Sequence, residues 1–218
     1  MVRHPGNTNL TLHHDASYLD LPVMQDKGPF VLGYLERLKQ TIDRTLAQYP
    51  RVFAFRVDLR LPTGQLLPDD AFTNQVMSRF IASFKGKIEH NRRRALDTSK
   101  YAHECNVRYV WAREVGEFGR PHYHLLILLN RDAYCALGSF TSEQSNTCHR
   151  LEEAWASALG LPLAAVNGLV HIPDNPTYML RRDDQQGVND LFYRASYLCK
   201  AATKSYGNGQ HGFGCSRQ

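Results

Sequence analysis

The sequence has no run of roughly 18 apolar residues, no pair of cysteines spaced C-x-x-C and no internal repeat. Without a long apolar run no transmembrane helix is expected, and the polar segment from Met1 to Asp15 offers no secretory signal. The five cysteines are scattered and odd in number, which argues against a disulfide framework or a cysteine zinc site. These absences predict a cytoplasmic protein with reduced thiols and no membrane partner.

The composition is that of an ordinary globular chain with a small basic excess. Of 218 residues, 43% are hydrophobic and 22% are charged, which excludes wholesale disorder, a collagen-like repeat and a coiled coil. Lysine and arginine number 26 against 21 acidic residues, so the net charge is +5. This excess permits a polyanionic partner but does not require one.

Hydrophobic periodicity predicts one α+β domain. Apolar residues at three- and four-residue steps indicate helices, and strict alternation, as between Phe53 and Leu61, indicates strands. The predicted helices cover residues 30–49, 69–96, 142–159 and 190–204, and the predicted strands cover 53–61, 107–115, 122–129 and 166–172. The order β-α-β-β-α-β in the middle of the chain is typical of a split βαβ fold of the ferredoxin or RRM type, an antiparallel sheet with helices on one face.

The two ends of the chain differ in composition from its middle. Residues 1–29 lack a clean period and contain several prolines and glycines, so we expect an irregular arm there. Residues 30–205 carry the periodic segments and form the predicted domain. Residues 206–218 are rich in glycine and are expected to form a flexible tail.

Two histidines one residue apart carry the clearest chemistry. His122 and His124 point to the same face of a predicted strand, and neutral imidazole is a good ligand for divalent metals. If the preceding hairpin is centred on Phe118, Glu114 lies directly opposite His122 and completes a compact site of two histidines and one carboxylate. A slip of one residue would move Glu114 to the other face, which leaves Glu117 as the alternative third ligand.

A His-x-His pair alone is a weak signal, because two partly exposed histidines at a strand end would give the same pattern. Several enzyme classes share the spacing. A nucleotide hydrolase of the histidine-triad type would need a third histidine where this chain has Leu126. A cupin-like site would need an all-β chain, whereas about half of this chain is predicted to be helical.

Two tyrosines and two lysines recur on one side of the last predicted helix. At about 100° per residue, Tyr193, Tyr197, Lys200 and Lys204 fall within one arc, and apolar residues occupy the other side. Tyrosines that rim a core with lysines beside them would look the same. The same array also fits covalent catalysis, because nearby ammonium groups or a metal favour the nucleophilic phenolate.

The segments Gly119-Arg120-Pro121-His122-Tyr123-His124 and Tyr197-Leu198-Cys199-Lys200 together resemble the HUH endonuclease superfamily. In that family a His-hydrophobic-His strand is followed by a Tyr-x-x-Lys helix. Over residues 52–204 the sequence looks like the inovirus-type replication proteins of bacterial prophages and mobile elements. The resemblance implies an HUH-type fold and rolling-circle replication initiation.

The resemblance also implies a role for each matching residue. His122, His124 and Glu114 would bind Mg²⁺ or Mn²⁺, Tyr197 would be the nucleophile, and Lys200 would be the motif's lysine. Tyr193 would be a second tyrosine, but here the lysine follows both tyrosines, whereas the commonest two-tyrosine pattern places it between them.

The expected activity is metal-dependent nicking and rejoining of single-stranded DNA or an origin hairpin through a 5′-phosphotyrosine, leaving a 3′-OH primer. The chain contains no helicase segment, so host helicase and polymerase are expected partners. The expected DNA contacts are Lys204, Arg92, Arg93, Arg94 and Arg120, although a basic helix end such as 92–94 is equally compatible with a solvated terminus. A non-catalytic DNA-binding regulator, an HUH transposase or mobilisation protein, and a hydrolase of small phosphoesters remain alternatives.

Overall fold

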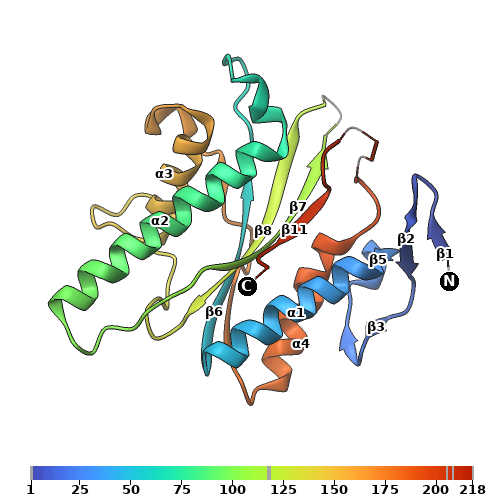
Figure 1. The fold of residues 1–218 in the computed structure, drawn as a ribbon, viewed down its shortest axis with the longest axis horizontal. Coiled ribbons are helices and arrows are strands. Elements are labelled where there is room, and N and C mark those ends of the chain that lie inside the picture. The colour runs from blue at the N-terminus through green and yellow to red at the C-terminus, as the bar shows by residue number, and fades with distance from the viewer. Residues whose placement is uncertain (1, 117–118, 205, 208, 218) are drawn as a thin grey trace.

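The computed structural model describes residues 2–116, 119–204, 206–207 and 209–217. Its centre is an antiparallel sheet in which the strands lie in the order β10-β6-β8-β7-β11 (Figure 1). The strand bounds are β6 Arg51–Leu59, β7 Arg108–Val115, β8 Pro121–Asn130, β10 Thr177–Arg181 and β11 Phe213–Cys215. A short strand, β9 Val170–His171, also pairs with β6. The predicted α+β class with an antiparallel sheet is therefore confirmed.

Four α-helices and four short 3₁₀-helices connect and cover the strands in the described part of the chain. The α-helices are α1 Leu32–Gln48, α2 Asn74–Thr98, α3 Thr147–Leu159 and α4 Gln185–Ser196. The 3₁₀-helices are η1 Gln25–Lys27, η2 Asp69–Phe72, η3 Leu163–Val166 and η4 Tyr197–Cys199. Side-chain caps begin three of the four α-helices: Thr73 accepts from the Gln75 amide at α2, Asn146 from the His149 amide at α3, and Asp184 from the Gly187 amide at α4.

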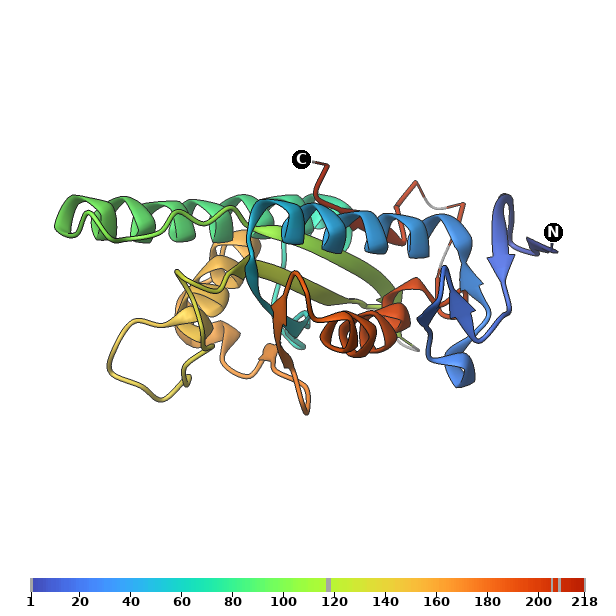
Figure 2. The same ribbon diagram turned by 90° about the horizontal axis from the view of Figure 1, so that it is seen from below.

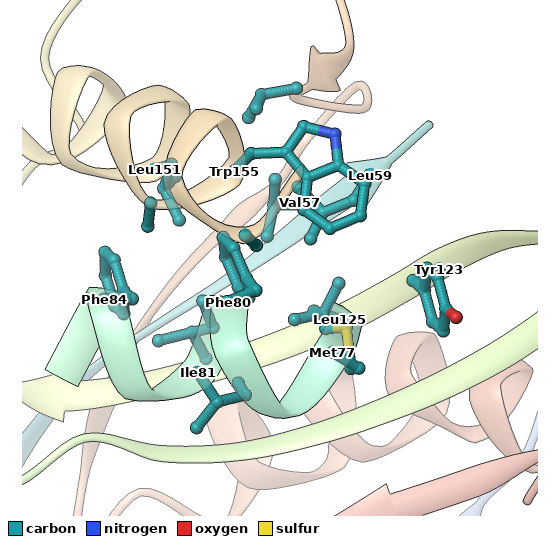
Figure 3. Close-up of a cluster of buried hydrophobic side chains, with 14 of the residues drawn as sticks. Val57, Leu59, Met77, Phe80, Ile81, Phe84, Tyr123, Leu125, Leu151 and Trp155 are labelled. Atoms are coloured by element: carbon teal, nitrogen blue, oxygen red, sulfur yellow. The ribbon is translucent and has the colours of Figure 1, made fainter. Parts of the chain in front are cut away.

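Helices cover both faces of the sheet, so the prediction of helices on one face is wrong. On one side α2 and α3 pack Phe80, Phe84 and Trp155 onto Val57 and Leu125 (Figures 1 and 3). On the other side α1 and α4 pack against the alternate residues of the same strands. The reason lies in β6 and β8, where consecutive residues are apolar and point to opposite faces of the sheet. Both faces of these strands therefore need to be covered.

The N-terminal region is more regular than predicted. Strands β1 Val2–His4, β2 Asn7–His13 and β5 Phe30–Val31 form a small antiparallel sheet, and β3 Ser17–Tyr18 pairs with β4 Leu21–Pro22. The prediction of an irregular arm is wrong for these strands, because β1, β3, β4 and β5 have only two or three residues and β2 is mostly polar, so the sequence shows no clear period.

The C-terminal segment also differs from its prediction. Residues 213–215 pair with β7 as an edge strand, and Phe213 is buried. A Cβ atom at Gly214 would lie 2.5 Å from the indole of Trp111, so this glycine permits close packing. At Gly214 the glycine therefore marks a tight contact within an ordered strand, and the prediction of a flexible tail is wrong for residues 213–215.

The last helix ends eight residues earlier than predicted. It runs from Gln185 to Ser196, continues as the 3₁₀ turn Tyr197–Cys199, and gives way to an extended residue, Lys200, which forms a β-bridge with Phe30. Tyr193, Tyr197, Lys200 and Lys204 therefore do not share one helical face. No helix within the described ranges combines the length and apolar character that crossing a bilayer would need.

Candidate metal centre and nucleophile

Three neighbouring strands place four ionisable side chains on the face covered by α1 and α4. Glu114 on β7 lies directly opposite His122 on β8, which is the register expected from a hairpin centred on residue 118. On the other side of β8, Asp58 of β6 lies directly opposite His124. The alternative ligand Glu117 and the expected centre Phe118 lie outside the described residues.

The geometry of Glu114, His122 and His124 suits a metal ion. Their candidate ligand atoms all lie within 4.8 Å of one another. Oε2 of Glu114 is 3.6 Å from Nε2 of His122 and 3.6 Å from Nε2 of His124, so one carboxylate oxygen faces both imidazoles. Nε2 of His124 is buried and has no hydrogen-bond partner among the described residues. An unpaired buried imidazole nitrogen, beside a second imidazole and a carboxylate, fits a divalent cation.

Asp58 fixes the orientation of His124. Its Oδ1 lies 2.6 Å from Nδ1 of His124. Burial acts to raise the pKa of Asp58, but His124, Arg56 and His171 together lower it below its usual value. An ionised carboxylate only accepts hydrogen bonds, so Nδ1 carries the proton and Nε2 is left as the free lone pair. Arg56 lies 3.4 Å from the same oxygen and holds the carboxylate in turn.

Sequence reasoning missed Asp58 and Arg56 as site residues. Both sit on β6 at alternating positions, and their side chains are 14% and 6% exposed. Two charged residues on one face of an otherwise apolar strand were the available signal, since buried charges need partners.

The turn after α4 brings the predicted nucleophile to the metal centre. Nζ of Lys200 donates a hydrogen bond to Oη of Tyr197 over 2.7 Å and lies 2.9 Å from Oε1 of Glu114. The rings of Tyr197 and His124 meet edge to face with centroids 5.4 Å apart. Residues from β7, β8 and the turn after α4, which are distant in sequence, therefore converge on one site.

Lys204 occupies a different place from the one predicted. Its side chain is 0% exposed, and its Nζ lies 3.6 Å from Oε1 of Glu114. Burial lowers the pKa of Lys204 to about 8, despite the favourable charge of Glu114. A side chain buried in this way is inconsistent with the predicted contact to a DNA backbone. The ammonium group of Lys204 instead lies beside the Glu114 carboxylate inside the protein.

The two oxygens of Glu114 thus have separate surroundings. The two lysines approach Oε1, and the two histidines approach Oε2. Burial disfavours the charged carboxylate, yet these four neighbours hold the pKa of Glu114 well below its usual value. Burial also opposes charge on His124, but Asp58 and Glu114 raise the pKa of His124. Without a metal, the site is a dense network of ion pairs.

Hydrogen bonds from the N-terminal region hold the turn that carries Tyr197 in place. The Met24 amide donates to Oγ of Ser196 over 2.9 Å, and the Ala201 amide donates to the carbonyl of Pro29 over 2.8 Å. These bonds lie on either side of Tyr197 along the chain. The position of Tyr197 therefore depends on residues 24–30. Tyr193 lies one turn earlier on α4 and is 42% exposed.

The four predicted DNA-contacting arginines have different surroundings. The guanidinium of Arg92 stacks over the ring of Tyr134, 4.6 Å from the ring centroid, and its Nε donates a hydrogen bond to the Tyr134 hydroxyl. Arg120 donates to the carbonyl of Pro62. Arg93 is exposed and pairs with Glu89, and Arg94 lines a surface groove. The structure gives Arg92 and Arg120 partners within the protein and leaves Arg93 and Arg94 at the surface.

Comparison with known proteins places this chain in a family. Residues 13–216 match the family described as the YagK/YfjJ C-terminal domain. The chain belongs to this family. Two similar proteins from Escherichia coli K12 are YfjJ, 34% identical over 87% of this chain and 96% of its own length, and YagK, 35% identical over 87% and 95%. Both YagK/YfjJ relatives are described as uncharacterized proteins, so the family alone assigns no activity.

One solved structure shows a faint likeness to this member of the YagK/YfjJ family. It is the N-terminal nuclease domain of minute virus of mice non-structural protein 1, described as coordinating Zn²⁺ in its active-site pocket and recognising DNA at the replication origin. The sequences are 12% identical, the match covers 85% of this chain and 77% of the other, and the TM-score is 0.25. A likeness this slight carries no inference about fold or function.

Proposed function

We propose that this protein is a metal-dependent endonuclease and strand transferase of the HUH type, which nicks and rejoins single-stranded DNA through Tyr197. The observation that carries the proposal is the bridge made by Lys200. Its ammonium group contacts both the phenolic oxygen of Tyr197, at 2.7 Å, and the metal-facing carboxylate Glu114, at 2.9 Å. A nucleophile and a candidate metal centre are thereby linked through one side chain.

Glu114, His122 and His124 are the residues that would hold Mg²⁺ or Mn²⁺. A divalent cation bound there would neutralise charge on the non-bridging oxygens of the scissile phosphate. Asp58 keeps Nδ1 of His124 protonated, so that the opposite nitrogen faces the ligand position.

Tyr197 and Lys200 would carry out the covalent step. The phenolic oxygen loses its proton to water while Lys200 stabilises the negative charge that develops on it. That oxygen attacks the phosphorus, the bond from phosphorus to O3′ breaks, and O3′ takes up a proton to leave a 3′-OH. The product is a 5′-phosphotyrosine, and because the number of phosphoester bonds is unchanged, a later 3′-OH can reverse the step. Tyr193 is the second tyrosine proposed for such a return step.

The chemistry of the products supports a role in rolling-circle replication of a phage or mobile element. A free 3′-OH can prime synthesis, and the covalently held 5′ end can be rejoined after one round. In this proposal the protein acts in the cytoplasm of a bacterial host on single-stranded DNA or an origin hairpin. Host helicase and polymerase would supply unwinding and synthesis. The same chemistry would also serve a transposase or a mobilisation protein.

The proposal is tested by incubating the protein with 5′- and 3′-labelled single-stranded oligonucleotides and Mn²⁺, followed by a denaturing gel. The expected result is a covalent adduct that retains the 3′ label, because the tyrosine keeps the 5′ phosphate of the downstream fragment. Tyr197→Phe should abolish the adduct, and Tyr34→Phe, a change to a tyrosine outside the proposed site, should retain it. EDTA should stop the reaction, and Mn²⁺ should restore it.

Three results would contradict the proposal. An adduct that persists in the Tyr197→Phe and Tyr193→Phe double variant would show that neither tyrosine is the nucleophile. Undiminished nicking in chelator would remove the metal role. DNA binding without any adduct on a broad panel of sequences would favour a non-catalytic regulator on the same fold.

A further inference from the structure

Two surface grooves flank the C-terminal half of α2, on the opposite end of the molecule from the N-terminal hairpin. The first, groove A, has a volume of about 710 Å³ and lies between α1, α2 and residues 105–108. The second, groove B, also has a volume of about 710 Å³ and lies between α2 and α3. Because α2 lines both, its exposed side forms a ridge between them.

Each groove is lined by three lysine or arginine side chains and a single carboxylate. Groove A contains Arg44, Lys85, Arg108 and Glu89. Groove B contains Lys87, Arg94, Arg150 and Glu153. The carboxylates are engaged within the protein, since Glu89 pairs with Arg93 at 3.1 Å and Glu153 with Lys87 at 2.8 Å. Both grooves therefore present a net positive charge.

The ridge between the grooves is accessible to solvent and carries small side chains at two positions. The C-terminal end of α2 forms one extremity of the molecule in both Figures 1 and 2. Gly86 lies on the exposed side, at the border of groove B, and a Cβ atom added there would meet nothing within 4 Å. Ala82 lies one turn earlier on the same side and is also exposed. Small side chains of this kind let another surface approach the helix closely.

These dimensions and charges match double-stranded DNA. A helix with its side chains is roughly 10–12 Å wide, and the major groove of B-DNA is about 12 Å wide. We infer that the C-terminal half of α2 lies in the major groove of a DNA duplex, with the two phosphate backbones that border the major groove seated in groove A and groove B. His90 lines groove B together with its cations, and the exposed side chain of Arg93, on the ridge, then faces the base edges.

This assignment refines the expectation from the sequence. Within the basic run, Arg94 lines groove B and Arg93 faces outward, while Arg92 is held by Tyr134 and has a structural role. The inference rests on the proposed function only in taking DNA as the partner. The duplex site uses α2, whereas the proposed nicking site lies on the sheet face covered by α1 and α4.

The test measures binding of a fluorescent duplex of about 20 base pairs by anisotropy, in EDTA, over a series of salt concentrations. The double variants Arg44→Ala/Lys85→Ala and Arg94→Ala/Arg150→Ala remove two cations from groove A and groove B respectively. Each should weaken duplex binding about tenfold or more and lower the salt slope by about 0.9 for each phosphate that is no longer neutralised.

A matched double variant, Arg37→Ala/Lys39→Ala, removes two cations from α1 outside both grooves and should leave duplex affinity within about twofold of the unaltered protein. Gly86→Glu tests the border between the ridge and groove B. The added side chain has room in the free protein and replaces a glycine in a helix, so the fold should be retained. It should still weaken duplex binding by more than about tenfold, because its carboxylate would face the DNA.

Several outcomes would overturn the inference. They are an absence of duplex binding by the unaltered protein, unchanged affinity in both groove variants, an effect confined to one groove, and an equal effect in the Arg37→Ala/Lys39→Ala control. Failure of the proposed function is recognised separately, because it appears as a missing adduct on short single-stranded DNA.

Discussion

Nδ1 of His124 donates a hydrogen bond to the carboxylate of Asp58 across 2.6 Å, between directly opposed residues of β6 and β8. The bond determines which imidazole nitrogen is free. Because Asp58 takes Nδ1, Nε2 points toward Glu114 and has no hydrogen-bond partner in the described part of the chain. The orientation of His124 in the candidate metal site is therefore fixed by β6, a strand that contributes none of the three candidate ligands.

Replacing Asp58 by asparagine should weaken metal binding while leaving the fold intact. The amide can still accept a hydrogen bond from Nδ1, but it lacks the charge that raises the basicity of the imidazole. We expect the affinity for Mn²⁺ to fall about 10- to 100-fold, measured by isothermal titration calorimetry. Asp97→Asn, at an exposed position near the end of α2, serves as the control. Equal affinities in the two variants would show that Asp58 does not support the metal.

Lys200 is expected to act on the nucleophile and not on DNA affinity. Lys200→Met removes the ammonium group that bonds Oη of Tyr197 but keeps a side chain of similar length. Nicking of a single-stranded oligonucleotide should slow by about 10²- to 10³-fold, as when one stabilising donor is removed. The defect should shrink as pH rises, because hydroxide then removes the phenolic proton. Lys39→Met on α1 is the control, and an unchanged rate in Lys200→Met would contradict the assignment.

Metal affinity should depend on pH through His124. Its pKa is raised by Asp58 and Glu114 in spite of burial, and the proton must leave Nε2 before a metal can bind. Below that pKa the apparent affinity for Mn²⁺ should fall by about tenfold for each pH unit.

The stability of the metal-free protein should fall as pH rises, whereas its affinity for metal should increase. A raised pKa means that charged His124 stabilises the fold below its unfolded pKa, about 6.5, and that this contribution disappears as pH rises through the folded value. The increase in melting temperature caused by Mn²⁺ should therefore be large above this range and small below it. Thermal melts with and without Mn²⁺ test this, and a shift that does not vary with pH would exclude His124 as a ligand.

The grouping of the three candidate metal ligands could be predicted from the sequence because it depends on residues that are close together in the chain. His122 and His124 share a face through the two-residue period of one strand, and a short hairpin fixes Glu114 opposite His122. Asp58 could not be placed in the same way. Its pairing with His124 depends on which strand becomes the neighbour of β8, and that is decided by the packing of the whole sheet.

The nucleophile segment shows where local reasoning fails. Periodicity continues the last helix through Lys204, but the structure ends it at Ser196, whose Oγ bonds the Tyr193 carbonyl and accepts from the Met24 amide. The next residues are then drawn into a bridge between Phe30 and Lys200. These partners lie far away in sequence, in the N-terminal region, so no window around Tyr197 could reveal them.

Glycine at position 214 should be essential for docking of the C-terminal strand. Alanine there would place its Cβ 2.5 Å from the indole of Trp111, and this ring packs edge to face against the buried Tyr123, with centroids 6.1 Å apart. We expect Gly214→Ala to destabilise the fold by about 1–3 kcal/mol, which corresponds to a fall of about 2–12 °C in melting temperature. Gly33→Ala is the matched control, because Gly33 lies in α1 with nothing within 4 Å of the added atom and should raise stability by about 0.5–1 kcal/mol. Circular dichroism melts of the two variants measure the difference, and a Gly214→Ala protein that melts no earlier than the unaltered one would mean that β11 is not packed as described.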